Sequence, residues 1–288
     1  MPFLGRDPYY IADMGYRMAT EVNDIRYKLE YDLGIEFEVT GKDTIRFIKN
    51  PELFRGLPEH IERLKGSKGE YITIRLGSIE IREKKSKLMR GQIGRIRSCF
   101  RLVHELFVLA RLIKYLIDEG ARILDKKIGI TPGFIPAMCT KEYGNRVSFE
   151  YLDSKITILY QPQFFLDIRG KMPRPDFVIV NDYIPNINYF AEKCVDRGAS
   201  PPVKCKAVIL DPKVSFSKRD YDELLRYQEL FPKGSRFLVL ALDGEAIPAN
   251  YKGMLEDRGW IIIENVKPDG GRFEGYIVNI MREVFKLA

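Results

Sequence analysis

Two short segments place charged side chains at the ends of apolar runs. The run AVIL at 207–210 is typical of a strand buried on both faces, and it leads directly into Asp211, Pro212 and Lys213. Side chains two residues apart on a strand point to the same side, so Asp211 and Lys213 set an acid beside a base. Asp176 opens another apolar segment, FVIV. If these two strands are neighbours, two carboxylates and one amine meet at one point.

Paired carboxylates beside a lysine suit the metal-assisted attack of water on a phosphate ester. Two close carboxylates repel each other, and Mg²⁺, which takes oxygen ligands and keeps several waters, removes that conflict. Such a metal lowers the pKa of its water and offsets charge on the phosphate, while Lys213 orients or deprotonates the water. The alternatives are that Asp176 belongs to a simple turn and that Asp211 and Lys213 form a surface ion pair, which stabilises little.

A further acid stands inside the helix predicted over residues 98–119. The apolar stripe of this helix is formed by Leu102, Leu106, Leu109, Ile113 and Leu116. Glu105 falls within the stripe, where an unpaired carboxylate is costly. A metal or a lysine across the site would compensate for that cost. Alternatively, Glu105 lies at the margin of the stripe and reaches solvent.

Composition excludes several other kinds of chemistry. The 288-residue chain has only two histidines, His60 and His104, which excludes most Ser-His, Cys-His and multi-histidine metal sites. Its four cysteines show no CxxC spacing, so neither a zinc site nor a disulfide framework is expected. The apolar runs are too short for a membrane span and no signal peptide is evident, so we expect a cytoplasmic protein that does not enter membranes.

The first part of the chain is expected to form a small α+β domain, residues 1–90. The patterns predict a helix over 14–32, a hairpin made by IEFEV and TIRFI, a short helix near 58–65, and a second hairpin made by EYITIRL and SIEIRE. The segment carries no evident catalytic group. It is expected to bind substrate or a partner.

The remainder, residues 91–288, is expected to form an α/β domain with a mixed central sheet flanked by helices. Strands are predicted near 146–151 and 156–161, in RPDFVIV, KAVIL, SRFLVLAL and WIIIENV, and helices in SKRDYDELLRYQELF and in the final GRFEGYIVNIMREVFKLA. The long stretch 181–205 is interpreted as an inserted, packed loop.

The basic balance of the chain indicates a polyanionic partner. The net charge is +7, and residues 82–97 hold seven Lys or Arg against one Glu. Such a run either contacts nucleic-acid phosphates or is a solvated face. The candidate contacts are Lys84, Lys85, Lys87, Arg90, Arg95 and Arg97.

Pro175-Asp176, Asp211-Pro212-Lys213 and the α-β-β-β-α-β order around them resemble the PD-(D/E)xK nuclease superfamily. Over roughly 98–241, the sequence is most similar to the branch that contains the nuclease subunits of McrBC-type restriction systems. The resemblance implies a restriction-endonuclease-like core, with Asp176, Asp211 and Glu105 as metal ligands and Lys213 as the catalytic lysine. It also implies that the Pro212 carbonyl faces the metal.

On the next helix, the resemblance implies accessory roles for Glu223 and Tyr227, or for Gln228 if the register slips by one residue. Relatives place a glutamine where this chain has Glu223. Ordinary exposed helix residues are the alternative for these positions.

The resulting expectation is a nuclease dependent on Mg²⁺ (or Mn²⁺), a DNA endonuclease of defence, repair or recombination. A homodimer and a motor NTPase partner are expected with it. The alternative is a nuclease-like fold that binds nucleic acid or assembles with other subunits without cleaving. A third reading is a structural domain with surface ion pairs at these positions.

Overall fold

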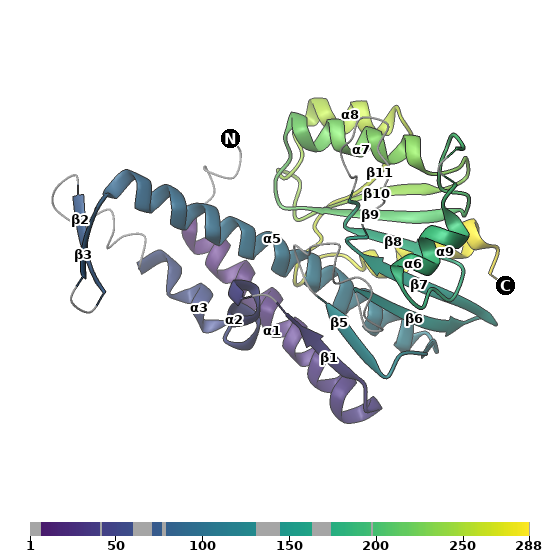
Figure 1. The fold of residues 1–288 in the computed structure, drawn as a ribbon, viewed down its shortest axis with the longest axis horizontal. Coiled ribbons are helices and arrows are strands. Elements are labelled where there is room, and N and C mark those ends of the chain that lie inside the picture. The colour runs from purple at the N-terminus through teal and green to yellow at the C-terminus, as the bar shows by residue number, and fades with distance from the viewer. Residues whose placement is uncertain are drawn as a thin grey trace.

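The computed structural model describes residues 7–40, 42–59, 71–76, 79–130, 145–162, 174–196 and 198–287. Figure 1 shows a long helix, α5 (Lys85–Asp118), running from a small hairpin toward a large central sheet. A second long helix, α1 (Pro8–Leu33), packs along α5. None of the described helices combines the length and the apolar character needed to cross a membrane.

The central sheet has seven strands and mixed directions. Its spatial order is β11-β10-β9-β8-β7-β6-β4. The three strands β9, β10 and β11 run parallel, whereas the remaining pairs are antiparallel. The bounds are β4 (Arg122–Ile123), β6 (Arg146–Tyr151), β7 (Ser154–Tyr160), β8 (Phe177–Val180), β9 (Ala207–Lys213), β10 (Arg236–Ala241) and β11 (Ile261–Ile263). This arrangement confirms the predicted α/β class with a mixed sheet.

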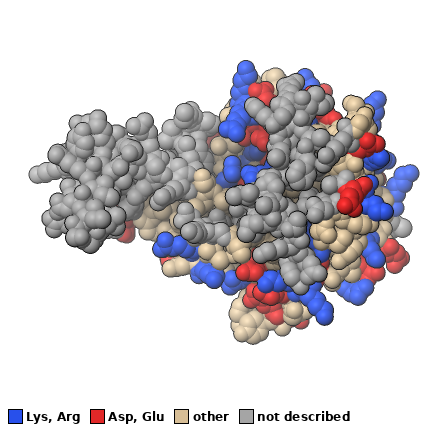
Figure 2. Space-filling model, viewed as in Figure 1, with Lys and Arg blue, Asp and Glu red and all other residues tan. Residues whose placement is uncertain are grey.

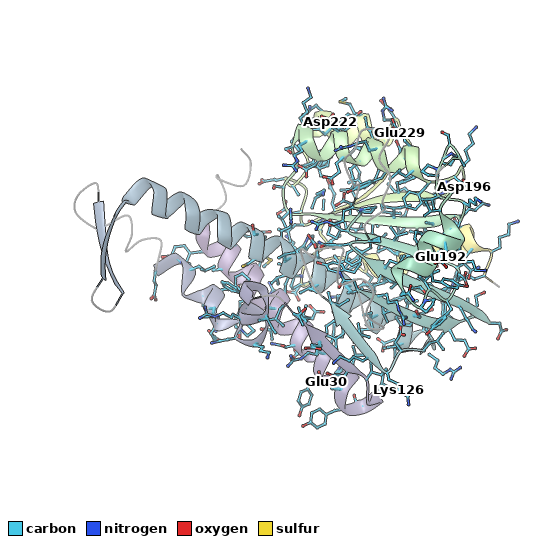
Figure 3. The ribbon with its side chains drawn as sticks, in the orientation of Figure 1. Glu30, Lys126, Glu192, Asp196, Asp222 and Glu229 are labelled. Carbon is cyan, nitrogen blue, oxygen red and sulfur yellow. The ribbon has the colours of Figure 1, made fainter. Side chains whose placement is uncertain are left out.

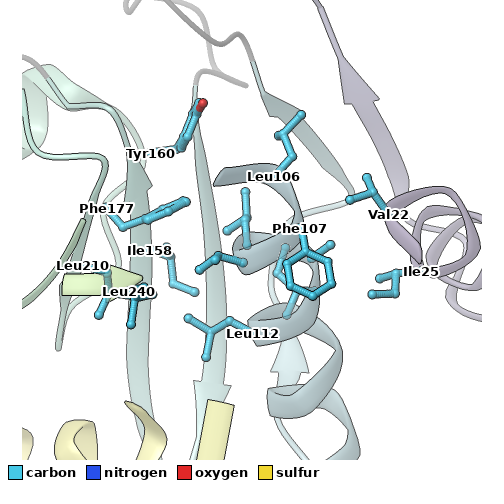
Figure 4. Packing of buried hydrophobic residues seen from close by; sticks show 14 of the residues in the cluster. Val22, Ile25, Leu106, Phe107, Leu112, Ile158, Tyr160, Phe177, Leu210 and Leu240 are labelled. Carbon is cyan, nitrogen blue, oxygen red and sulfur yellow. The ribbon is translucent and has the colours of Figure 1, made fainter. Parts of the chain in front are cut away.

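Helices cover both faces of the sheet because alternate residues of its buried strands point to opposite sides. Phe177 and Leu210 face a core shared with α1, α5 and α9 (Phe273–Phe285). Val178 and Ile209 face a second core with α6 (Ile187–Cys194), α7 (Lys218–Leu230) and α8 (Ala249–Glu256). The first core is the larger. Figure 4 shows its labelled members Val22, Ile25, Leu106, Phe107, Leu112, Ile158, Tyr160, Phe177, Leu210 and Leu240.

One predicted element of the N-terminal part is wrong. The segment IEFEV does form a strand, β1 (Glu36–Val39), but β1 pairs in parallel with β5 (Lys127–Ile130) instead of with TIRFI. The TIRFI segment lies in helix α2 (Lys42–Lys49). There Ile48 is buried, and Phe47 packs on Phe54 of α3 (Glu52–Arg55) with ring centroids 4.5 Å apart. These tertiary contacts outweigh the local β propensity of the segment.

The other predicted elements that fall within the described residues are present, with shifted ends. The second hairpin is formed by β2 (Tyr71–Leu76) and β3 (Ile79–Lys84), and the helices predicted over 14–32 and 98–119 lie within α1 and α5. The predicted helix near 58–65 falls largely outside the described residues. Short helix α8 was not predicted. The stretch 181–205 contains α6 and packs onto the sheet, as expected, through the fully buried Ile184 and Phe190.

The N-terminal elements and the sheet share a core. Buried side chains of α1, such as Met18 and Val22, belong to the same hydrophobic cluster as the sheet residues. Arg111 of α5 forms ion pairs with Glu21 of α1 and with Glu274 of α9, which ties the three helices together. Helix α5 runs through the expected boundary at residue 90, and the division of the chain there remains a prediction.

Candidate active site

The register of the sheet brings Asp176 and Asp211 face to face. Strands β8 and β9 are antiparallel, and the pair Phe177–Leu210 is the last one at this end. One step further along the same register sets Asp176 directly opposite Asp211. Directly opposed residues project on the same face with Cβ atoms about 5 Å apart. Asp211 is buried and Asp176 is partly exposed.

The two carboxyl groups are close enough for a hydrogen bond when one of them holds a proton. Burial, together with the charge of the nearby Glu105, raises the pKa of Asp176 from 3.8 to about 6 against the opposing effect of Lys213. Burial also raises the pKa of Asp211 well above its usual value, and the Asp176 carboxylate adds to that rise. Among the described residues, the ammonium of Lys213 is the one cation in ion-pair contact with Asp211, through Oδ1. The pair therefore favours binding a proton or another cation.

Lys213 completes this cluster from the same strand. Its Nζ lies 2.6 Å from Asp211 Oδ1 and 3.7 Å from Asp220 Oδ1, and its side chain is largely buried. These carboxylates raise the pKa of Lys213 above its usual value despite burial of the amine. Strand β9 continues through Lys213 because β10 pairs along its whole length, so the backbone of the motif is fixed by the ladder.

Pro212 fits the central strand without removing a ladder hydrogen bond. The carbonyl of Lys213 accepts a hydrogen bond from the Leu242 amide at 2.9 Å, so it points toward β10. Successive residues of a strand point their backbone groups to opposite sides, and Pro212 therefore directs its nitrogen and carbonyl toward the β8 side. Pairing with β8 has already ended at Leu210. The missing amide of Pro212 therefore lies outside the paired part of the strand, and the Pro212 carbonyl lies on the strand edge that faces Asp176.

Glu105 is fully buried, so it does not reach solvent at the margin of its helix. Its Oε2 accepts hydrogen bonds from Tyr160 Oη at 2.7 Å and Gln161 Nε2 at 2.8 Å. Its Oε1 lies 3.3 Å from Nε of Arg101, one helical turn earlier. Burial raises the pKa of Glu105, and Arg101 is the strongest influence that lowers it.

Gln161, which follows β7, connects Glu105 to the aspartate pair. The side-chain amide of Gln161 donates a hydrogen bond to Glu105, and its backbone amide donates one to the carbonyl of Asp176 at 2.7 Å. The charges of Asp211 and Lys213 also act on Glu105. Glu105 is thus a neighbour of the pair with its own hydrogen bonds.

On α7, Tyr227 and Glu223 lie toward the strand that leads into Asp176. Tyr227 is buried, and its hydroxyl lies 3.0 Å both from the Arg174 carbonyl and from Glu223 Oε1. Gln228 instead donates to the Arg258 carbonyl at 2.9 Å, away from the aspartates. Burial raises the pKa of Tyr227, and the charge of Asp211 adds to this effect. Tyr227 and Glu223 therefore support the backbone that leads into Asp176.

The outer surface of α7 is polar, as Figure 3 shows for its labelled residues Asp222 and Glu229. Its inner face is formed by Tyr221, Leu224, Tyr227 and Leu230, which are buried.

The basic stretch has its backbone in β3 and α5, but the side chains of Lys84, Lys85, Lys87, Arg90, Arg95 and Arg97 lie outside the described part of the structure. On the face drawn in Figure 2, the described basic and acidic side chains are interspersed over the surface. The candidate nucleic-acid contacts of this stretch remain predictions.

Two carboxylates of the site, those of Asp176 and Asp211, could bind a divalent cation. Among the described residues, no three His, Cys, Asp or Glu side chains already converge as ligands of one metal. Mg²⁺ is commonly bound through one or two carboxylates, with water and substrate oxygens completing its shell. The opposed Asp176 and Asp211, with the Pro212 carbonyl at the same strand edge, meet that requirement. Glu105 would join only after its side chain rotates away from its present partners.

Sequence reasoning missed four residues that contact this cluster, namely Arg101, Tyr160, Gln161 and Asp220. The ion pair of Arg101 could have been predicted, because an arginine and a glutamate four residues apart on a helix favour such a pair. Asp220 could have been predicted as well, as the third residue after the helix-capping Ser217.

Comparisons of this chain with protein-family models, with curated proteins and with solved structures found no match.

Proposed function

We propose that this protein is a Mg²⁺- or Mn²⁺-dependent nuclease that hydrolyses phosphodiester bonds, with DNA as its substrate. The observation that carries the proposal is the opposed pair of the partly exposed Asp176 and the buried Asp211, with the ammonium of Lys213 2.6 Å from Asp211. Two close carboxylates repel each other when both are ionised, and a bound cation offsets that repulsion. A lysine held beside them is placed to act on a phosphate.

A divalent cation held by Asp176, Asp211 and the Pro212 carbonyl would supply a Lewis acid that offsets the charge developing on the phosphate. Glu105 would add a third carboxylate after leaving Tyr160. The raised pKa of Lys213 keeps its amine protonated at neutral pH. Lys213 therefore acts as a positive charge that orients water and stabilises the phosphate in the transition state, and not as the base that removes a proton.

The rest of the proposal concerns the setting of the reaction. The net charge of +7 supports a polyanionic substrate, bound through its backbone with little sequence readout. We place the activity in defence, repair or recombination in the cytoplasm, as an endonuclease. The N-terminal segment would bind substrate or a motor NTPase, and a homodimer would cut both strands of a duplex.

A panel of linear, circular, single-stranded and branched DNA tests this proposal. The protein is incubated with each substrate in Mg²⁺, Mn²⁺ or EDTA, beside the Lys213→Ala variant and beside Gln228→Ala, whose side chain points away from the site. Metal-dependent cleavage by the unmodified protein and by Gln228→Ala, but not by Lys213→Ala, is expected. Cleavage that persists unchanged in Lys213→Ala would refute the proposed role of the lysine.

A second candidate is a nuclease-like subunit that binds nucleic acid without cleaving it. The observation that favours it is the pair of internal salt bridges, Lys213 with Asp211 and Arg101 with Glu105, which neutralise the carboxylates with the chain's own cations. DNA binding without metal-dependent cleavage on any substrate would select this candidate.

A further inference from the structure

Arg101 reaches the candidate site from the solvent side of α5. Its side chain is 52% exposed, whereas that of Glu105, its ion-pair partner, is fully buried. The negative charges of Glu105, Asp176 and Asp211 all act on its guanidinium. Among the described residues, both Arg101 and Lys213 act as cations on Asp176.

The two cations are held in different ways. Lys213 is 12% exposed and is held by Asp211 and Asp220 together. Arg101 has one ion pair among the described residues, through Nε at 3.3 Å. A guanidinium has five N–H donors in a planar fork that matches two phosphate oxygens. Lys213 is therefore held between two carboxylates. Arg101 is half exposed, and it has N–H donors besides the Nε that pairs with Glu105.

The charges of the site define what it accepts. The carboxylates of Glu105, Asp176, Asp211 and Asp220, when ionised, outnumber the two cations Arg101 and Lys213 by two charges. One divalent cation would bring this cluster to neutrality. A cation that took Glu105 as a ligand would also compete with Arg101 for it, and would so leave the guanidinium for the phosphate.

We propose that Arg101 is a substrate-binding residue that exchanges its ion pair with Glu105 for the non-bridging oxygens of a nucleic-acid phosphate. This inference rests on the proposed nuclease function and assigns a residue that positions its substrate. The bound phosphate would lie next to Asp176, the partly exposed carboxylate of the site.

Binding of a fluorescently labelled DNA duplex, followed by anisotropy, tests the inference. Ca²⁺ replaces Mg²⁺, and a gel checks that the DNA stays intact. Arg101→Ala is compared with Arg122→Ala, which also removes one exposed arginine paired with one glutamate, at the far edge of the sheet. Losing one phosphate contact lowers the slope of log affinity against log salt by about 0.9. The ratio of wild-type to Arg101→Ala affinity should therefore fall about 3.5-fold between about 50 and about 200 mM salt. Arg122→Ala should keep the wild-type slope.

Two further readouts separate a binding role from a structural one. Arg101→Lys should keep the salt slope and lose part of the affinity, because an ammonium lacks the planar fork. In cleavage with Mg²⁺, Arg101→Ala should raise KM more than it lowers kcat. Circular dichroism checks that each variant is folded.

An unchanged salt slope and KM in folded Arg101→Ala would overturn the inference while leaving the nuclease proposal intact. The same holds if Arg101→Ala only tightens Mn²⁺ binding, since Arg101 would then act as a counter-ion alone. Conversely, the unmodified protein could cut no DNA while Arg101→Ala lowers the slope of log affinity against log salt. That result would support the phosphate contact and refute the proposed cleavage. A wild-type protein that does not bind DNA overturns both.

Discussion

Replacing Asp176 with asparagine should stabilise the protein at alkaline pH in EDTA. The variant keeps the shape of the side chain and removes its charge from the cluster with Glu105 and Asp211. The pKa of Asp176 rises from 3.8 to about 6 on folding. Each pKa unit corresponds to about 1.4 kcal/mol, so ionised Asp176 destabilises the fold by about 3 kcal/mol at most. Since Asp176 is partly exposed and coupled to Asp211, we expect about 1–3 kcal/mol of gain.

The stability gained by Asp176→Asn should increase with pH. Well below a pH of about 3.8, Asp176 is protonated in both the folded and the unfolded chain, so the charge has no effect on stability. Between about 4 and about 6, the unfolded chain releases the proton first, and the stability of the wild-type protein falls as pH rises. Above about 6 the whole cost is present. The gain of Asp176→Asn should therefore be small near pH 4, at most about 0.5 kcal/mol, and complete near pH 8.

Urea unfolding in EDTA, with buffers at a pH of about 4 and about 8, measures this difference. Asp222→Asn, which changes an exposed acid on the outside of α7, is the matched control and should stay within about 0.5 kcal/mol of wild type. Saturating Mn²⁺ at about pH 8 should stabilise wild type by roughly 3 kcal/mol at 100 times its Kd, and Asp176→Asn by much less. Equal effects of Asp176→Asn at both pH values would refute the assigned carboxyl pair.

Three further substitutions test separate parts of the account. Lys213→Met should lower the cleavage rate by about 10²-fold or more, measured in single-turnover assays, while DNA binding persists. Tyr227→Phe should lower the free energy of unfolding by about 1 kcal/mol, measured in urea, because the hydroxyl lies 3.0 Å from both Glu223 and the carbonyl before Pro175. Gly15→Ala should destabilise by about 1–3 kcal/mol in thermal or urea unfolding, because its Cβ would lie 2.4 Å from the Phe54 ring; an unchanged stability would contradict the packing of α1 on α3.

The candidate site was readable from sequence because its residues belong to strands with strong apolar runs. The runs at 177–180 and 207–210 predict buried strands, and charged residues at the ends of two such strands indicate a shared site if the strands are neighbours. The sequence could not show that Asp176 and Asp211 are opposed, because that depends on the register of β8 and β9. It also could not show that Pro212 sits where pairing with β8 has ended.

Other features depended on contacts between distant parts of the chain. The segment TIRFI has the composition of a strand, yet it forms a helix because Ile48 and Phe47 pack on neighbouring helices. Glu105 accepts hydrogen bonds from Tyr160 and Gln161, which lie more than 50 residues away in the sequence, at the end of β7. Local patterns carry no information about such pairs, whereas the ion pair of Arg101 with Glu105 follows from helical spacing alone.

The central claim is that the opposed aspartates support metal-dependent hydrolysis of DNA. Its most direct test is a single-turnover cleavage assay titrated with Mn²⁺, with the unmodified protein beside Asp211→Asn. We expect a rate that rises with Mn²⁺ and saturates for the unmodified protein, vanishes in EDTA, and is absent for folded Asp211→Asn at every Mn²⁺ concentration. Cleavage by Asp211→Asn at the wild-type rate, or cleavage that persists in EDTA, would contradict the claim.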